Sequence, residues 1–173
     1  CMKLLIAGDS YSDVKYGDNW VKRFPDAECV ARIGNSNYDI WQSIKDRTWN
    51  LLVVNLSHPN RLNRASIENK DAGRQRKFLE EFPATQKKLH DLSIRFAEQI
   101  LDLPNVICWS PFPHYESWKI VHSIILPEED DMWMSNPKDY RPDPIVGCHY
   151  TQKGNEIVYE KISGWILDWV NKK

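Results

Sequence analysis

Met2-Lys3-Leu4-Leu5-Ile6-Ala7-Gly8-Asp9-Ser10 is the stretch of this chain that says most about its fold. Its almost uninterrupted apolar run predicts a strand that is buried on both faces of a sheet. Gly8 then permits a sharp turn, because a residue without a Cβ adopts backbone conformations that other residues avoid. We therefore expect Ser10 at the carboxyl end of a central strand, where open α/β sheets bind ligands and where its hydroxyl is a candidate nucleophile. The alternative is a plain strand-to-helix turn in which Asp9 or Ser10 caps a helix.

Strand-like and helix-like segments alternate along the rest of the chain. This alternation predicts an α/β fold, with a mostly parallel sheet between layers of helices. Strands are expected over 4–7, 27–33, 51–56 and 105–109, and helices over 19–24, 38–49 and 85–101, with a last helix capped by Thr151. The proline-rich segment 111–144 reads as loop, apart from an apolar element at 118–126. No internal repeat divides the sequence, so 1–173 is expected to form a single domain.

Composition excludes several classes of partner. Hydrophobic residues make up 42% of the 173 residues and charged residues 27%, which is typical of a soluble globular protein. The net charge of -1 gives no indication of a nucleic-acid or anionic-membrane partner, and no segment approaches the roughly 20 apolar residues of a membrane span. The sequence leaves the oligomeric state open.

The cysteines and the start of the chain suggest a compartment. Cys29, Cys108 and Cys148 are too widely spaced to indicate a metal site or a disulfide framework. Reduced thiols in a cytoplasmic protein are the simplest interpretation. No signal peptide is visible, and Cys1, in front of Met2, is expected to be an addition ahead of the native start.

Four short segments stand where predicted strands end or where the last helix begins. They are Gly8-Asp9-Ser10-Tyr11-Ser12-Asp13, Ile33-Gly34-Asn35-Ser36, Ser57-His58-Pro59-Asn60-Arg61 and Gly147-Cys148-His149-Tyr150-Thr151-Gln152-Lys153-Gly154. With these residues in this order, the chain resembles the SGNH hydrolases, also called GDSL esterases and lipases, over residues 8–154. The resemblance implies a three-layer α/β/α sandwich with a flavodoxin-like central sheet, a serine esterase activity, and no cofactor or metal.

The resemblance also implies a role for each matched residue. Ser10 is the nucleophile and His149 the general base, since a hydroxyl attacks an ester only when a base takes its proton and imidazole titrates in the right range. The oxyanion donors are the backbone N–H groups of Ser10 and Gly34 and the side-chain amide of Asn60. Glycine suits position 34 because a Cβ there would crowd the substrate.

The third segment departs from the family's Gly-x-Asn-Asp. Aligning Asn60 with the family's asparagine places His58 at the glycine position and Arg61 at the aspartate. Asn55 is the alternative asparagine, although it lies within the predicted strand 51–56.

The last segment departs as well. Val146 stands three residues before His149, where the family has its triad aspartate. Asp143 is the nearest acidic candidate for orienting the imidazole, and a backbone carbonyl in a Ser-His dyad is the alternative.

Taken together, these residues predict a serine hydrolase acting on a small ester. O-acetyl groups on a carbohydrate are the substrate that the resemblance favours, with Tyr11 and Trp109 as candidate substrate contacts. A catalytically silent carbohydrate- or ligand-binding module on the same scaffold is the alternative. A phosphate-binding loop over residues 8–13 is less favoured, because one glycine and two acids suit an anion poorly.

Overall fold

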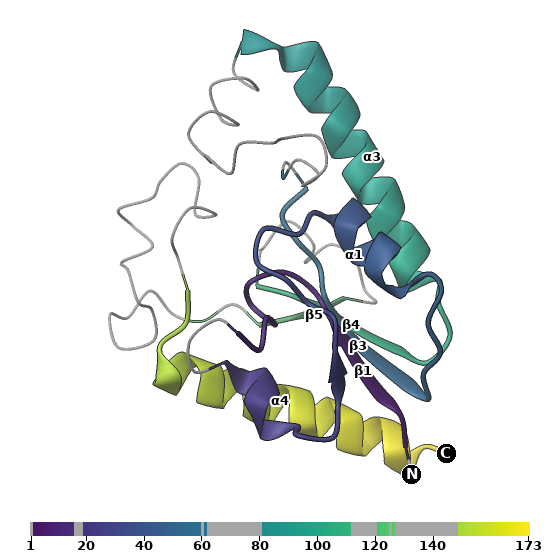
Figure 1. The fold of residues 1–173 in the computed structure, drawn as a ribbon, viewed down its shortest axis with the longest axis vertical. Helices are drawn as coiled ribbons and strands as arrows, with labels where there is room; N and C mark the ends of the chain where they lie inside the picture. Colours follow the sequence, from purple (N-terminus) through teal and green to yellow (C-terminus); the bar gives the residue numbers. More distant parts are fainter. Residues whose placement is uncertain are drawn as a thin grey trace.

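The fold is α/β, and its core is one five-stranded sheet in which all strands run parallel. The computed structural model describes residues 2–15, 19–59, 61, 81–111, 121–124, 126 and 149–173. Within them the sheet order is β2-β1-β3-β4-β5 (Figure 1). The strands are β1 (Leu4–Ala7), β2 (Glu28–Cys29), β3 (Leu51–Asn55), β4 (Val106–Ser110) and β5 (Val121–Ser123). The predicted α/β class and parallel sheet are confirmed.

The order in which successive strands are added to the sheet reverses beside β1, although all the strands run parallel. The chain moves from β1 to β2 on one side, then crosses to β3 on the other side of β1 and continues to β4 and β5. Such a reversal is a topological switch point, and open α/β sheets bind ligands outside the carboxyl ends of the strands at this place. Ser10 follows β1 and Gly34 follows β2, so these two predicted site residues lie at the switch point.

The two faces of the sheet bury different side chains, because successive residues of a strand point to opposite faces. Figure 1 shows α1 (Asn37–Ile44) and α3 (Pro83–Leu101) on one side of the sheet and α4 (Gln152–Asn171) on the other, with η1 (Trp20–Arg23) packed beside α4. We call the cluster against α1 and α3 the aliphatic core; it contains Leu5, Ala7, Ile40, Ile44, Leu52, Val54, Leu56, Ala97, Ile100 and Cys108.

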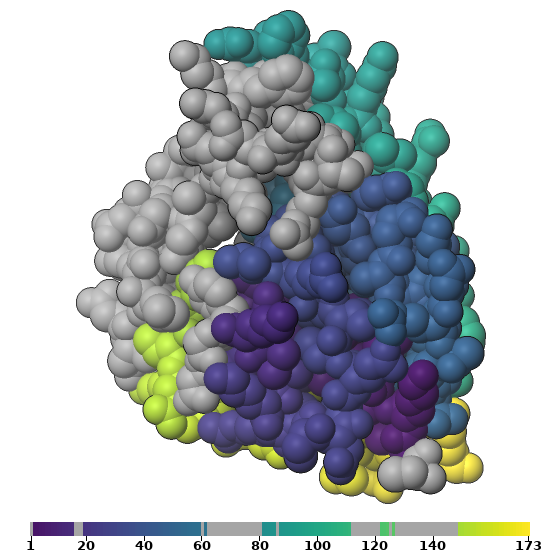
Figure 2. Space-filling model, viewed as in Figure 1, coloured from purple at the N-terminus to yellow at the C-terminus, as the bar shows by residue number. Residues whose placement is uncertain are grey.

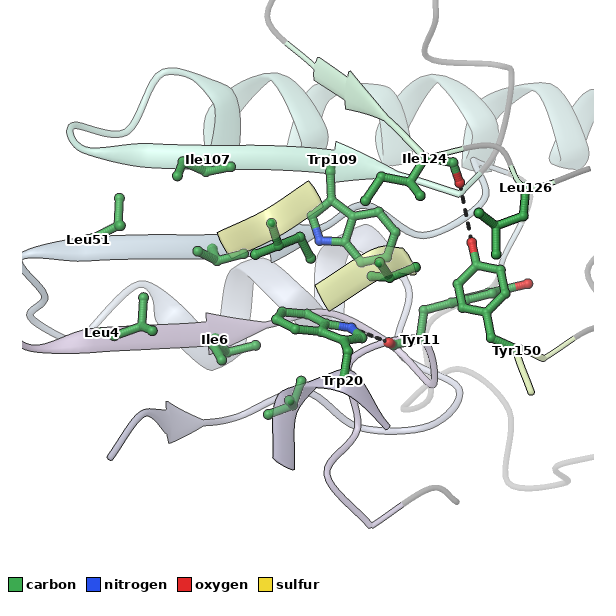
Figure 3. Close-up of a cluster of buried hydrophobic side chains, with 14 residues drawn as sticks. Leu4, Ile6, Tyr11, Trp20, Leu51, Ile107, Trp109, Ile124, Leu126 and Tyr150 are labelled. Atoms are coloured by element: carbon green, nitrogen blue, oxygen red, sulfur yellow. Dashed lines mark hydrogen bonds between the residues drawn. The ribbon is translucent and has the colours of Figure 1, made fainter. Parts of the chain in front are cut away.

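The cluster against η1 and α4 is richer in rings, and we call it the aromatic core (Figure 3). Its members are Leu4, Ile6, Tyr11, Trp20, Val21, Leu51, Val53, Ile107, Trp109, Ile124, Leu126, Tyr150, Val158 and Ile162. The aromatic core includes the residue that follows each of the two main predicted site residues. Tyr11 follows Ser10, and Tyr150 follows His149.

Local signals explain where the helices begin. Thr151 caps α4 as predicted, and its side chain accepts a hydrogen bond from the backbone N–H of Gly154 at 3.3 Å. Ser36 caps α1 in a capping box with Asp39, so this helix begins one residue before the predicted start. Pro83 begins α3, as the missing N–H of proline costs nothing in the first turn. In the described residues, every helix is too short or too polar to cross a membrane.

Two predicted elements are shorter in the structure. The helix expected over 38–49 ends at Ile44, and the indole of Trp49 instead donates a hydrogen bond to the carbonyl of Pro104 at 3.1 Å. The strand expected over 27–33 is reduced to Glu28–Cys29 at the edge of the sheet.

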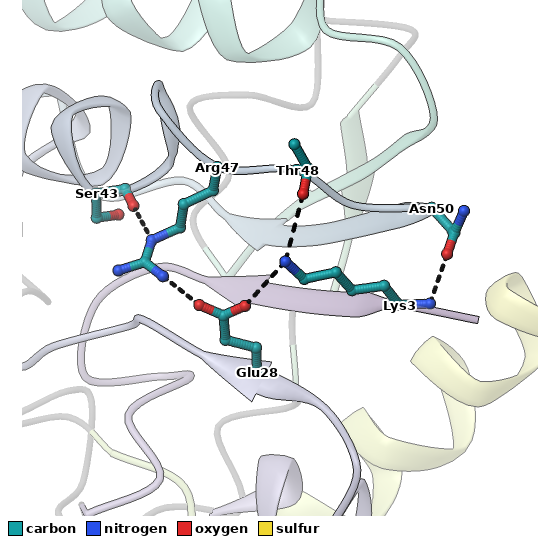
Figure 4. Close-up of polar contacts among 6 residues, drawn as sticks. All are labelled: Lys3, Glu28, Ser43, Arg47, Thr48 and Asn50. Carbon is teal, nitrogen blue, oxygen red and sulfur yellow. Dashed lines mark hydrogen bonds and ion pairs between the residues drawn. The ribbon is translucent and has the colours of Figure 1, made fainter. Parts of the chain in front are cut away.

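An exposed cluster of polar contacts holds this edge strand (Figure 4). Glu28 forms ion pairs with Lys3, at 3.4 Å, and with Arg47. The backbone N–H of Lys3 donates to the side chain of Asn50 at 2.7 Å. Exposed ion pairs each contribute little, so this cluster sets the position of β2 more than it stabilises the fold.

Candidate active site

The structure brings Ser10 and His149 together from opposite ends of the chain. The two residues are 139 positions apart, and Ser10 Oγ lies 2.9 Å from Nε2 of His149. Ser10 is delivered by the turn after β1, and His149 by the segment that enters the N-cap of α4. Figure 2 shows the purple N-terminal residues and the yellow-green start of α4 on one face of the molecule. This is the hydroxyl–imidazole contact that the sequence predicts.

Gly8 begins the turn that presents Ser10, and we call residues 8–12 the nucleophile turn, after the role that the sequence predicts for Ser10. Gly8 has a φ of +150°, and a Cβ built on it would lie 1.8 Å from Oδ1 of Asn55. Both the conformation and the lack of space therefore require glycine at this position. The backbone N–H of Ser12 closes the turn by donating to the carbonyl of Asp9 at 3.1 Å.

Asn55, the last residue of β3, is fully buried against this turn. Its Nδ2 donates to Oδ1 of Asp9 at 2.8 Å, and its Oδ1 accepts a hydrogen bond from the hydroxyl of Ser12. With both ends of the amide occupied in this way, Asn55 is poorly placed to serve as the oxyanion asparagine. Asn60, the other asparagine considered for that role, lies outside the described residues.

The ring of Tyr11 packs against the imidazole of His149. It stacks on His149 with ring centroids 5.7 Å apart and an interplanar angle of 28°, and it meets the ring of Tyr150 edge-on at 5.0 Å. Tyr11 is 4% exposed, as is Ser10, and its ring packs between His149 and Tyr150; its role as a substrate contact stays a prediction. Burial, together with the nearby Tyr11 and Asp9, raises the pKa of the Tyr150 phenol well above its usual value.

The backbone carbonyl of Tyr11 in the nucleophile turn accepts hydrogen bonds from two side chains. The indole N–H of Trp20 donates to the carbonyl of Tyr11 at 2.8 Å (Figure 3), and the Asn19 amide donates to the same oxygen at 3.1 Å. Trp109, the other expected substrate contact, is fully buried and meets Trp20 edge-on with centroids 6.1 Å apart. Its place is therefore in the aromatic core and not at a substrate-facing surface.

The loop that carries Gly34 runs beside the nucleophile turn. The backbone N–H of Arg32 donates to the carbonyl of Gly8 at 3.2 Å, and that of Ile33 donates to Oδ2 of Asp13 at 2.9 Å. Gly34 has a φ of +81°, and in the described part of the chain no atom beyond its two neighbours lies within 4 Å of the place where its Cβ would be. Among those residues the space beside Gly34 is open, which is what a backbone N–H that faces a substrate would need.

A groove of about 1000 Å³ extends from this loop along β2 toward α1. Its lining includes Lys15, Arg32 and the half-buried Cys29. Within the described parts of the chain, the side chains of Lys15 and Arg32 form no hydrogen bond or ion pair. Burial raises the pKa of the Cys29 thiol, so this group stays protonated near neutral pH.

The segment after β3 is held by hydrogen bonds from α1, which packs against the aliphatic core. Asn37, the first residue of α1, accepts a hydrogen bond from the backbone N–H of Ser57 at 2.8 Å and donates to its carbonyl at 3.1 Å. His58 is buried next to it. The third segment therefore starts from a defined position at the switch point.

Several residues named by the sequence lie outside the described residues, namely Asn60, Asp143 and Val146. Their roles stay predictions. Among the residues that are described, no three His, Cys, Asp or Glu side chains are arranged to hold a metal ion.

Sequence reasoning did not foresee the structural use of Asn55 and Asn37. A signal for Asn55 was present, because it is a polar residue at the end of the apolar run Leu51-Leu52-Val53-Val54. A buried amide in such a place needs hydrogen-bond partners.

Sequence comparison with protein families and with curated proteins provides no relative from which a function could be transferred. The chain matches no protein-family model, and no curated protein sequence is significantly similar to it. Its function has to be inferred from the arrangement of Ser10, His149 and the nucleophile turn.

Proposed function

We propose that this chain is a serine esterase of the SGNH type, which hydrolyses a small ester through an acyl-enzyme on Ser10 with His149 as general base. The observation that carries the proposal is the 2.9 Å contact between Ser10 Oγ and His149 Nε2 at the switch point of a parallel sheet. That distance lies within the range, roughly 2.6–3.2 Å, expected of a nucleophile and its base.

In the proposed reaction, Ser10 Oγ bonds to the acyl carbon while its proton passes to His149 Nε2. The tetrahedral intermediate then expels the alcohol oxygen, which takes that proton from the imidazolium. A water molecule next gives a proton to Nε2 and attacks the acyl carbon. Collapse of the second intermediate returns a proton to Ser10 Oγ and releases the carboxylic acid.

The negative oxygen of both intermediates needs donors that are already in place. We assign this role to the backbone N–H groups of Ser10 and Gly34 and to the side-chain amide of Asn60. The positive φ of Gly34 and the open space beside it support this assignment. Loss of one such donor typically lowers the rate by about 10²- to 10³-fold.

The imidazole also needs a partner for its second nitrogen. If Nε2 is to accept a proton, Nδ1 must carry one, and an acceptor must hold that tautomer. Asp143 is the acidic residue we propose for this role, with a backbone carbonyl as the alternative. In serine proteases, loss of the triad aspartate lowers kcat by about 10⁴-fold.

The resemblance to SGNH hydrolases also implies an architecture and a substrate class. We propose a single domain over 1–173 with the three-layer α/β/α, flavodoxin-like architecture of SGNH hydrolases, and a cytoplasmic location. O-acetyl groups on a carbohydrate are the proposed substrate.

The proposal is tested with a fluorophosphonate probe and p-nitrophenyl acetate. We expect covalent labelling and turnover in the wild type, and loss of both in Ser10→Ala and His149→Ala. Peptide mapping of the labelled protein should find the probe on Ser10. Thermal unfolding of each variant is the control for folding.

The other outcomes are equally informative. Folded wild-type protein without labelling or turnover would favour a carbohydrate- or ligand-binding module on the same scaffold. Turnover that survives Ser10→Ala would show that the nucleophile is a different residue.

A further inference from the structure

We propose that Asn55 is a positioning residue, whose side-chain amide holds the nucleophile turn in the conformation from which Ser10 reacts. This inference rests on the proposed esterase function and adds to it a residue outside the triad and the oxyanion hole.

Asn55 forms hydrogen bonds to the turn on both sides of Ser10. Its Nδ2 donates to the side chain of Asp9, one residue before the nucleophile, and its Oδ1 accepts from the hydroxyl of Ser12, two residues after it. The same Oδ1 fills the space above Gly8, where a Cβ would lie 1.8 Å away. One amide therefore contacts the turn at three points.

Only an amide of this length can form both bonds. An aspartate at position 55 would lose the donor and place a second carboxylate against Asp9, and an alanine would lose both bonds. Asn55 and Asp9 are both fully buried, so water cannot easily replace a lost partner. The backbone that carries the amide is itself held in place, because β3 pairs with β1 from Leu4↔Leu51 to Ala7↔Val54.

The carboxylate of Asp9 depends on this amide. Its Oδ1 accepts from Asn55 and from the backbone N–H of Tyr11 at 3.1 Å. Its Oδ2 has no hydrogen-bond partner among the described residues. Without Asn55, Asp9 would keep one of its two described bonds, and we expect the turn to relax around it.

A relaxed turn moves Ser10 Oγ relative to His149 Nε2, and a displacement of about 1 Å at a reacting group can lower the rate by about 10²-fold. We therefore expect Asn55→Asp and Asn55→Ala to lower kcat and the rate of fluorophosphonate labelling by about 10²-fold, with KM changed by less than about threefold. Ser12→Ala removes one of the bonds and should give a smaller loss of the same kind.

The matched control is Val54→Ala, the residue before Asn55 on the same strand, which is also fully buried but packs in the aliphatic core. It should lower the melting temperature and leave kcat within about twofold of the wild type. The double variant Asn55→Ala/Ser12→Ala should be no slower than Asn55→Ala alone, because both changes break the same bond.

Near-normal kcat in folded Asn55→Asp, or an equal loss of kcat in Val54→Ala, would overturn the positioning role while leaving the esterase in place. If the Asn55 variants do not fold, Ser12→Ala with a normal kcat would overturn it instead. Wild-type protein in which Ser10 is not labelled would overturn the proposed function, and this inference with it.

Discussion

The aliphatic core and the aromatic core pack against opposite faces of one sheet, but they are built differently. The aliphatic core is made of branched side chains, alanines and one cysteine, and burial raises the pKa of that Cys108 thiol, which stays protonated. The aromatic core contains two tyrosines and two tryptophans, whose rings carry polar groups as well as apolar surface.

The polar groups of these rings connect the aromatic core to the candidate site. In the aromatic core, Trp20 bonds to the carbonyl of Tyr11, Tyr11 stacks on His149, and Tyr150 donates to the carbonyl of Ile124 at 3.3 Å. Packing on this face is thus joined to the nucleophile turn and to the imidazole. The aliphatic core stabilises the sheet from the other side. We infer that its apolar side chains can be changed without changing the catalytic geometry.

The largest expected effect tests the aliphatic core. Leu52→Ala should destabilise the protein by about 2–5 kcal/mol, because it removes a fully buried side chain and leaves a cavity. Its kcat should be unchanged under conditions where the variant stays folded. Denaturant unfolding and the ester assay measure the two quantities. A fall in kcat comparable to that of the Asn55 variants would show that both faces support the site.

A matched pair of tryptophans gives an intermediate effect within the aromatic core. Trp20 and Trp109 are both fully buried, but in the described residues only the indole N–H of Trp20 has a partner. Trp20→Phe should therefore cost about 0.5–1.5 kcal/mol more than Trp109→Phe, because it also removes a hydrogen bond to Tyr11. Denaturant unfolding of the two variants gives the difference, and Trp20→Phe alone should lower kcat. Equal losses for the pair would contradict the link between packing and the turn.

The smallest effect concerns an aromatic contact on β5. The ring of His122 stacks on Trp165 with centroids 4.3 Å apart, and burial, followed by the charge of Lys172, lowers the pKa of His122. The unfolded chain therefore binds this proton at higher pH than the folded protein, and stability is lost as the pH falls below about 6.5.

Because His122 is partly exposed, its contribution should stay below about 1 kcal/mol. Urea unfolding at pH 7.5 and pH 5.0 should show a smaller loss of stability on acidification in His122→Gln than in the wild type, with kcat unaffected at pH 7.5. An identical loss in both proteins would assign the acid sensitivity to other groups.

Much of this fold could be predicted because the signals are local. The apolar run ending at Gly8 defines β1, and Thr151 marks the start of α4. Predictions were wrong where distant residues decide the outcome. The helix expected over 38–49 ends early, and Trp49 instead bonds to Pro104, which follows α3.

In the candidate site, too, features with local sequence signals could be predicted and features that depend on distant contacts could not. The contact between Ser10 and His149 could be predicted from motifs, because both residues stand in segments that resemble those of a known family. The role of Asn55 could not, since its bonds depend on the register of β3 against β1, and hydrophobic periodicity gives the strand but not the register. Trp109 was expected at a cleft but lies in the packed interior, and hydrophobic periodicity could not predict this for the same reason.

The contrast between Gly8 and Gly34 has a consequence for how this chain can vary. Gly8 has a positive φ and an occupied neighbourhood, so no other amino acid fits there without displacing Asn55. Gly34 has a positive φ too, but among the described residues beyond its chain neighbours nothing occupies the place of its Cβ, so a side chain there would meet the proposed substrate and not the protein. Sequences that diverge from this one should therefore keep the first glycine wherever they keep the fold, and the second only where they also keep the proposed ester chemistry.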